Sequence, residues 1–102
     1  MRLITSERAK RDIEEIARYI ALDSSQSAEE FRKAVSNAFE RLLHTPEMGS
    51  HRGFYNPALD DLRMMRLHNY TNYLIFYRPS GEEKLEVIRI VHGARDLPTL
   101  FE

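Results

Sequence analysis

The sequence predicts an α+β domain in which an antiparallel helical hairpin packs on a mainly antiparallel sheet. Apolar residues recur at helical spacing in the first half of the chain, and three short apolar runs separated by turn residues follow in the second half. A brief apolar stretch at residues 2–5 precedes the helices, so the expected order is strand, helix, helix and three strands, with a short C-terminal tail. A chain of 102 residues is expected to form one domain, residues 1–102.

Two helices are predicted before residue 46. The first is expected to begin at Thr5 or Ser6, whose hydroxyl can cap a helix, and its apolar face is Ala9, Ile13, Ile16, Ala17 and Ile20. Ser27 is followed three positions later by Glu30, which is the pattern of a capping box, so we expect the second helix to begin there and Pro46 to end it. A short polar connection between two helices favours antiparallel packing.

Three strands are predicted at residues 63–68, 73–78 and 84–92, after a loop rich in Gly, Pro and Asn at 46–62. If neither connecting turn carries a bulge, His68 lies opposite Tyr73 and Pro79 lies opposite Lys84. The face expected to meet the helices is then Met65, Leu67, Leu74, Phe76, Leu85, Val87 and Val91. The other face is mixed in polarity and comprises Met64, Arg66, His68, Tyr73, Ile75, Tyr77, Glu86, Ile88, Ile90 and His92.

Arg89 falls among the side chains expected to face the helices. A buried guanidinium without a partner is costly. Three explanations stay open: Arg89 pairs with an acid, its side chain passes a helix end to reach water, or the true register differs by one residue, which would exchange the two faces.

Composition excludes several kinds of site. A formal net charge of −1 gives no bulk basic field for nucleic acid, so we expect no direct sequence-specific DNA binding by this chain. The absence of Cys excludes disulfides and thiolate metal sites, and we predict neither a metal site nor a cofactor. No apolar run approaches membrane-spanning length and no signal peptide is visible, so a cytoplasmic protein with no membrane contact is expected.

Two segments carry a resemblance to a known family. Residues 73–78 read YLIFYR and residues 88–98 read IRIVHGARDLP, and together with the expected order of elements they resemble the RelE/ParE superfamily of bacterial toxin–antitoxin modules. The first helix, residues 9–20, is also similar. The resemblance covers nearly the whole chain. It implies a toxin held inactive by a partner antitoxin, acting either on messenger RNA in the ribosome, as RelE-like members do, or on DNA gyrase, as ParE-like members do.

The ribonuclease residues of RelE-like members are mostly absent. Such enzymes resemble one another in having lysines before the second strand of the chain, an Arg at the end of that strand, an Arg beyond the last strand and a Tyr near the C-terminus; here the second strand is residues 63–68, and it ends near His68 and Asn69 with no Lys in the loop before it. Arg95 matches the Arg beyond the last strand, but Phe101 stands at the Tyr position and cannot transfer a proton. The resemblance therefore favours a ParE-like gyrase inhibitor, with Arg95 and Phe101 as target-binding residues and no catalytic residue.

One alternative is a ribosome-dependent endoribonuclease that uses histidine. Arg66, His68, His92 and Arg95 could converge at one end of the sheet, and a His side chain titrates close to neutral pH, as acid–base catalysis requires. A further alternative is an inert member that binds an antitoxin without harming the cell.

The resemblance also implies a ParD-like antitoxin whose C-terminal segment wraps the toxin. Arg11 and Arg18 could pair with acidic antitoxin residues, and Tyr19 and Phe31 could supply apolar contacts. The other interpretation is that the arginines are solvated and that Phe31 belongs to the core.

Overall fold

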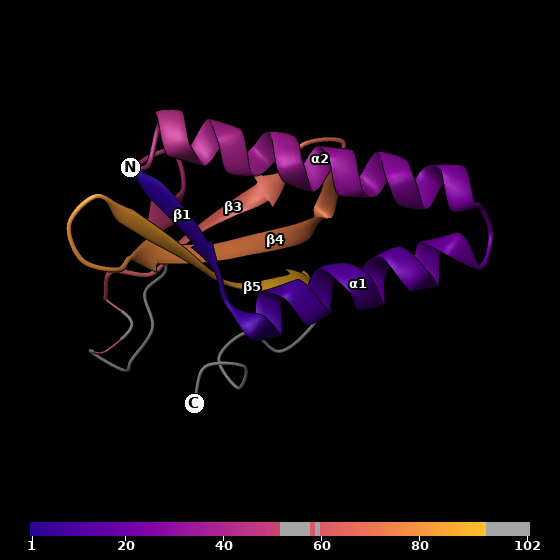
Figure 1. The fold of residues 1–102 in the computed structure, drawn as a ribbon, viewed down its shortest axis with the longest axis horizontal. Helices are drawn as coiled ribbons and strands as arrows, with labels where there is room; N and C mark the ends of the chain where they lie inside the picture. Colours follow the sequence, from indigo (N-terminus) through magenta and orange to yellow (C-terminus); the bar gives the residue numbers. More distant parts are fainter. Residues whose placement is uncertain (52–57, 59, 94–102) are drawn as a thin grey trace.

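A computed structural model describes residues 1–51, 58 and 60–93, in which two helices lie on one face of a five-stranded sheet (Figure 1). The elements are β1 (Arg2–Thr5), α1 (Glu7–Ala21), α2 (Ser25–His44), β2 (Ser50–His51), β3 (Arg63–Leu67), β4 (Tyr70–Pro79) and β5 (Lys84–His92). The strand order is β1-β5-β4-β3-β2. The predicted α+β class is confirmed.

Strand pairing is antiparallel in three of the four strand pairs, whereas β1 pairs with β5 in parallel. The first and last of the described strands are therefore neighbours. The helical hairpin connects β1 at one edge of the sheet to β2 at the other edge. The two-residue strand β2, at the far edge beside β3, was not predicted because it lies inside the segment expected to be loop.

The helix starts follow from two serines. Ser6 caps α1 as predicted, and its Oγ accepts a hydrogen bond from the amide of Ala9 at 3.0 Å. The predicted start of α2 at Ser27 is wrong, because Ser24 is the cap and its Oγ accepts from the amide of Ser27 at 3.1 Å. The hairpin turn is therefore shorter than expected, and α2 begins three residues earlier than its sequence pattern suggested.

The predicted register of the meander is also wrong, because irregularities occur beside the β3–β4 turn and within the pairing of β4 with β5. Leu67 pairs with Tyr70, and the register shifts between Arg66 and Leu67. Pro79 pairs with Leu85 rather than Lys84. Strand β4 is therefore turned over relative to the prediction, as a one-residue slip requires.

Helix-facing and outward-facing residues change accordingly. Tyr73, Ile75 and Tyr77 pack with the helices, whereas Leu74 and Phe76 lie on the other face. Met65, Leu67, Leu85 and Val87 face the helices as predicted. In β5 the register shifts again, since Phe76 pairs with Arg89 but Tyr77 with Val87, and the shift moves Ile90 to the helix side and Val91 to the other.

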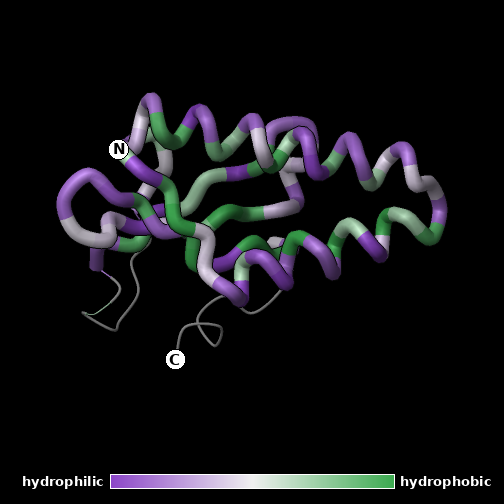
Figure 2. Tube along the Cα trace, in the orientation of Figure 1, coloured by the Kyte–Doolittle hydropathy of each residue, from purple (hydrophilic) through white to green (hydrophobic). Residues whose placement is uncertain are grey.

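The core has one part on each side of the sheet. The larger cluster lies between sheet and hairpin and includes Phe31, Leu42, Ile75 and Tyr77, each completely buried. Figure 2 shows hydrophobic and hydrophilic residues alternating along both helices, as amphipathic helices require. A smaller cluster of Leu62, Leu74, Phe76 and Val91 lies on the opposite face.

Candidate protein-binding groove

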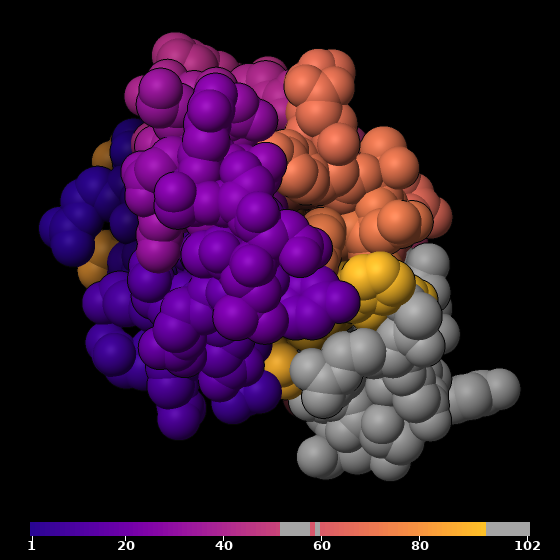
Figure 3. Space-filling view, turned by 90° about the vertical axis from the view of Figure 1, so that its right-hand side faces the viewer, coloured from indigo at the N-terminus to yellow at the C-terminus, as the bar shows by residue number. Residues whose placement is uncertain are grey.

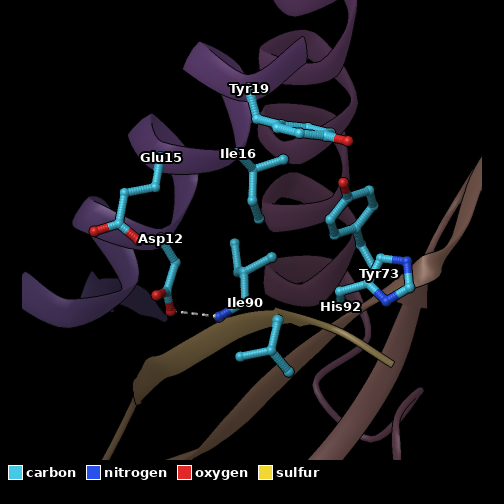
Figure 4. Close-up of a pocket in the computed structure, with 8 residues that line it drawn as sticks. Asp12, Glu15, Ile16, Tyr19, Tyr73, Ile90 and His92 are labelled. Atoms are coloured by element: carbon cyan, nitrogen blue, oxygen red, sulfur yellow. Dashed lines mark hydrogen bonds between the residues drawn. The ribbon is translucent and has the colours of Figure 1, made fainter. Parts of the chain in front are cut away.

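A groove of about 400 Å³ separates α1 from the C-terminal end of β5 (Figure 4). We call it the α1–β5 groove. Its lining residues are Asp12, Glu15, Ile16, Tyr19, Tyr73, Ile90, Val91 and His92. The helical residues are spaced three or four apart and so share one side of α1, while the strand residues come from the adjacent ends of β4 and β5.

The outer wall of the groove is aromatic and accessible. Tyr19, which lines the groove, is 71% exposed. Figure 4 shows the Tyr19 ring extending from α1 toward the side of the groove that carries Tyr73 and His92. Exposed large apolar side chains beside a concave surface are characteristic of a protein-binding site.

The inner wall is an aromatic stack. Tyr73 packs edge-on against Phe31, with ring centroids 5.6 Å apart, and against His92 at 5.4 Å. Burial raises the pKa of the Tyr73 hydroxyl above its ordinary value, and the neighbouring Tyr19 adds to the shift. The shift favours the neutral phenol, so Tyr73 offers the groove a hydroxyl for hydrogen bonding.

A buried ion pair forms one end of the groove. The Asp12 carboxylate accepts from Nε of Arg89 at 2.8 Å and from NH2 of Arg89 at 3.1 Å. It also accepts from the amide of Ile90 at 3.0 Å and lies 3.4 Å from Nε of Arg8. Asp12 is 4% exposed and Arg89 is 8% exposed, so the pair is largely shielded from solvent.

These contacts explain how Arg89 can be buried and how the backbone groups at the edge of β5 find hydrogen-bond partners. Strand β1 pairs with β5 only as far as Thr5, and beyond that point α1 covers the edge. The Ser6 hydroxyl donates to the carbonyl of Ile88 at 2.9 Å, and Asp12 accepts the amide of Ile90. Of the three explanations left open for Arg89, pairing with an acid is confirmed, and the register also differs from the prediction.

The groove suits binding better than proton transfer. Asp12 is fully engaged by its two arginines and a backbone amide, which leaves Glu15, the tyrosine hydroxyls and His92 as its polar groups. Ile16, Ile90 and Val91 supply its apolar surface. An apolar surface with a sparse polar rim is the usual composition of the centre of a protein interface.

The four residues predicted to contact an antitoxin differ in accessibility. Tyr19 lines the groove, and Arg11 and Arg18 are exposed on α1, with no ion pair to any residue that the structure describes. The prediction for Phe31 is corrected. Its ring is completely buried and packs edge-on against Tyr70 and Tyr73, so it supports the groove from within the core and presents no surface to a partner.

The candidate ribonuclease residues are not assembled within the described part of the chain. His92 lines the α1–β5 groove, whereas His68 lines a separate groove beside α2. Arg66 pairs with Leu74 on the face away from the helices, and its guanidinium donates to the carbonyl of Thr71 at 2.9 Å. Arg95 and Phe101, predicted to bind the target, lie outside the described residues.

Asp12, Glu15, Ile16 and Ile90 are groove residues that the sequence analysis did not identify. One signal could have found Asp12. Asp12 stands beside the apolar face of the first helix, and Arg89 stands in an apolar strand, so each places a charge where an apolar residue is expected. Two such charges of opposite sign can be buried together as an ion pair.

Among residues 1–51, 58 and 60–93, no group of three or more His, Asp or Glu side chains is arranged to hold a metal ion. In the same part of the chain, neither helix is long and apolar enough to cross a membrane.

Comparison with known proteins agrees with this architecture. Residues 3–97 match the family model described as the ParE toxin of the type II toxin–antitoxin system parDE. Among solved structures, the chain is similar to one described as the chromosomal ParDE TA system from P. aeruginosa, with a TM-score of 0.71 and 19% identity over 90% of this chain and 95% of that chain. The second similarity concerns the fold. A search of curated proteins gives no match.

Proposed function

Because the chain belongs to the ParE toxin family of type II toxin–antitoxin systems, we propose that it inhibits DNA gyrase and that a ParD-like antitoxin inactivates it by binding the α1–β5 groove. The observation that carries the proposal is the family match over residues 3–97. The geometry of the described residues is consistent with it, because the α1–β5 groove is lined mainly by apolar and aromatic side chains suited to contact with a partner.

The α1–β5 groove fits an amphipathic antitoxin segment. Ile16, Tyr19 and Ile90 offer apolar contact area, and Arg18, exposed on the same helix, can pair with an acidic residue of the segment. A segment that folds on binding needs such anchors to offset the entropy it loses on becoming ordered.

Gyrase is favoured over the ribosome because a ribonuclease needs an acid, a base and cations around one phosphate. His68 and His92 line grooves with no residue in common, and Arg66 lies on the opposite face from His92. The described residues therefore supply no such constellation.

The gyrase proposal is tested with the purified chain, purified gyrase and relaxed plasmid. We expect loss of supercoiling together with accumulation of cleaved DNA, and we expect an equimolar amount of cognate antitoxin to restore activity. Unimpaired supercoiling at micromolar chain, combined with cleavage of messenger RNA on translating ribosomes, would instead support the ribonuclease.

The groove assignment is tested separately by antitoxin affinity. Tyr19→Ala is expected to weaken antitoxin binding about tenfold, the magnitude typical of a buried aromatic anchor. Leu22→Ala is the matched control, since Leu22 is similarly exposed at the end of α1 but does not line the groove. Equal effects of the two substitutions, measured by calorimetry, would place the antitoxin elsewhere.

A further inference from the structure

A second groove lies on the other side of the hairpin, between α2 and the turn that joins β3 to β4. Figure 3 shows this turn, in orange, next to the magenta part of the hairpin that belongs to α2. Two adjoining hollows of about 280 and 520 Å³ share Ala34, Asn37 and Asn69 in their linings, so they form one continuous depression. We call it the α2–turn groove; its remaining lining residues are Glu30, Lys33, Arg41, His68 and Tyr70.

The cations of this groove form no ion pair within the part of the chain that the structure describes. Lys33 and Arg41 are exposed and form no ion pair with the described residues, in contrast to the adjacent Arg32, which pairs with Glu14 at 3.1 Å and Glu29 at 2.6 Å. Exposed His68 also lines the groove. Among the described residues that line it, Glu30 is the one acid, at the end that carries Lys33.

The arrangement is regular because Lys33, Asn37 and Arg41 are each four residues apart on one side of α2. At 1.5 Å per residue, the two cations are separated by about 12 Å along the helix axis. The opposite wall is held by Asn69, whose backbone has a φ of 67°, a left-handed conformation that asparagine tolerates better than most residues. The hydrogen bond from Arg66 to the Thr71 carbonyl braces the same turn.

We propose that the α2–turn groove binds an extended acidic peptide segment, with two carboxylates four residues apart meeting Lys33 and Arg41. In an extended chain, side chains four residues apart point to the same side and are about 13 Å apart, which matches the spacing of the two cations. The side-chain amides of Asn37 and Asn69 can hydrogen-bond to the peptide backbone between those carboxylates.

An acidic peptide fits this groove better than a nucleic acid does. Two permanent cations release few counterions, so phosphate binding would be weak and quickly lost as salt is added. Glu30 would repel a continuous phosphate backbone but can be avoided by a peptide whose charges are spaced. Tyr70 is half-buried and packs on Phe31, so its ring is not a platform for stacking a base.

The proposal is independent of the antitoxin assignment, because the two grooves have no lining residue in common. The α2–turn groove would therefore stay open to an acidic segment, from the target or another partner, while the α1–β5 groove is occupied.

The test titrates the isotopically labelled full chain with a nine-residue Ser/Thr-rich peptide carrying two glutamates four residues apart, and follows amide chemical shifts. We expect shifts at Asn37, Arg41, His68 and Asn69 and none at Ile16 or Tyr19. Lys33→Ser and Arg41→Ser should each weaken binding by about two- to fivefold, the range for an exposed ion pair. Arg2→Ser, which removes an exposed cation of β1 that lines neither groove, should leave binding unchanged.

Three outcomes would overturn the proposal. These are no shifts at millimolar peptide, equal binding of the same peptide with glutamine in place of glutamate, and binding of a duplex or single-stranded oligonucleotide at the groove where the acidic peptide does not bind. Shifts confined to the α1–β5 groove would count as the first outcome, since the proposed site would then be silent.

Discussion

Asp12 links the first helix to the last strand through a carboxylate that is surrounded by donors. Two nitrogens of Arg89, the amide of Ile90 and Nε of Arg8 all lie within 3.4 Å of its oxygens. Burying two charges is offset only when such additional hydrogen bonds satisfy them. The pair also fixes the end of the α1–β5 groove, because Asp12 and Ile90 both line it.

Asp12→Ala should therefore be among the most destabilising single substitutions in the chain. Removing one member of a buried pair leaves the other charge unpaired and costs about 3–5 kcal/mol. Urea denaturation measures this, with Glu14→Ala as the control, because the Glu14–Arg32 pair is exposed to solvent and should contribute little to stability. The double variant Asp12→Leu/Arg89→Met should recover part of the loss. Equal free energies of unfolding for Asp12→Ala and Glu14→Ala would show that the buried pair contributes no more to stability than the exposed one.

Tyr77 fixes the segment that follows α2. Its hydroxyl donates to the carbonyl of Pro46 at 2.8 Å and accepts from the amide of Gly49 at 2.8 Å. Gly49 is required there, because a Cβ at this position would lie 2.6 Å from the Tyr77 hydroxyl and 2.9 Å from the Met64 carbonyl. Tyr77→Phe leaves both backbone groups without this partner, and we expect a loss of about 1–3 kcal/mol in the free energy of unfolding.

Because of the same hydroxyl, we expect the free energy of unfolding to fall at alkaline pH. Burial raises the pKa of Tyr77 above its ordinary value of 10.0, so the folded state favours the neutral phenol. The corresponding stability is fully present below pH 10 and is lost as the pH rises through the folded-state pKa. Denaturation curves from pH 8 to 11 should show a steeper loss for the native chain than for Tyr77→Phe. Parallel pH dependence of the two would contradict this assignment.

At the scale of elements, helices and strands differ in how well their sequence specified them. Helical periodicity located both helices and Ser6 as the first cap, and three apolar runs located β3, β4 and β5. The faces of β4 were mistaken because register depends on local irregularities, one beside the β3–β4 turn and one between Phe76 and Tyr77, which carry little signal in residue type. Arg89 was the one residue whose misplacement in the predicted face pointed to the error.

The two candidate caps of α2 offer a direct comparison. Ser24→Ala removes the oxygen that accepts from the Ser27 amide and should cost about 1 kcal/mol. In a domain of this size that corresponds to a drop of about 4–8 °C in Tm. Ser27→Ala, at a half-buried position inside the helix, should change Tm little. If thermal unfolding shows a larger effect for Ser27→Ala than for Ser24→Ala, the helix cap is Ser27, as the sequence pattern suggested, and this account of α2 is wrong.

At the scale of the molecule, one hairpin presents two different surfaces. The α1–β5 groove is apolar with an aromatic rim, whereas the α2–turn groove is cationic and amide-rich. The order of elements and two sequence segments were enough to predict the fold and the toxin family. Of the residues that line the α1–β5 groove, Tyr19 alone was predicted as an antitoxin contact. The others were missed because the depth of a groove depends on the distance between helix and sheet, and the periodicity of a sequence does not encode that distance.

The central claim is that the chain acts on DNA gyrase and does not cut RNA, and incorporation of labelled thymidine and methionine after induction without antitoxin tests it most directly. We expect thymidine incorporation to fall first, in cells producing the native chain and in those producing His92→Ala, while methionine incorporation continues. Early arrest of methionine incorporation with DNA synthesis intact, abolished by His92→Ala, would contradict the claim in favour of a ribonuclease. Unchanged growth with soluble folded protein would contradict it in favour of an inert member.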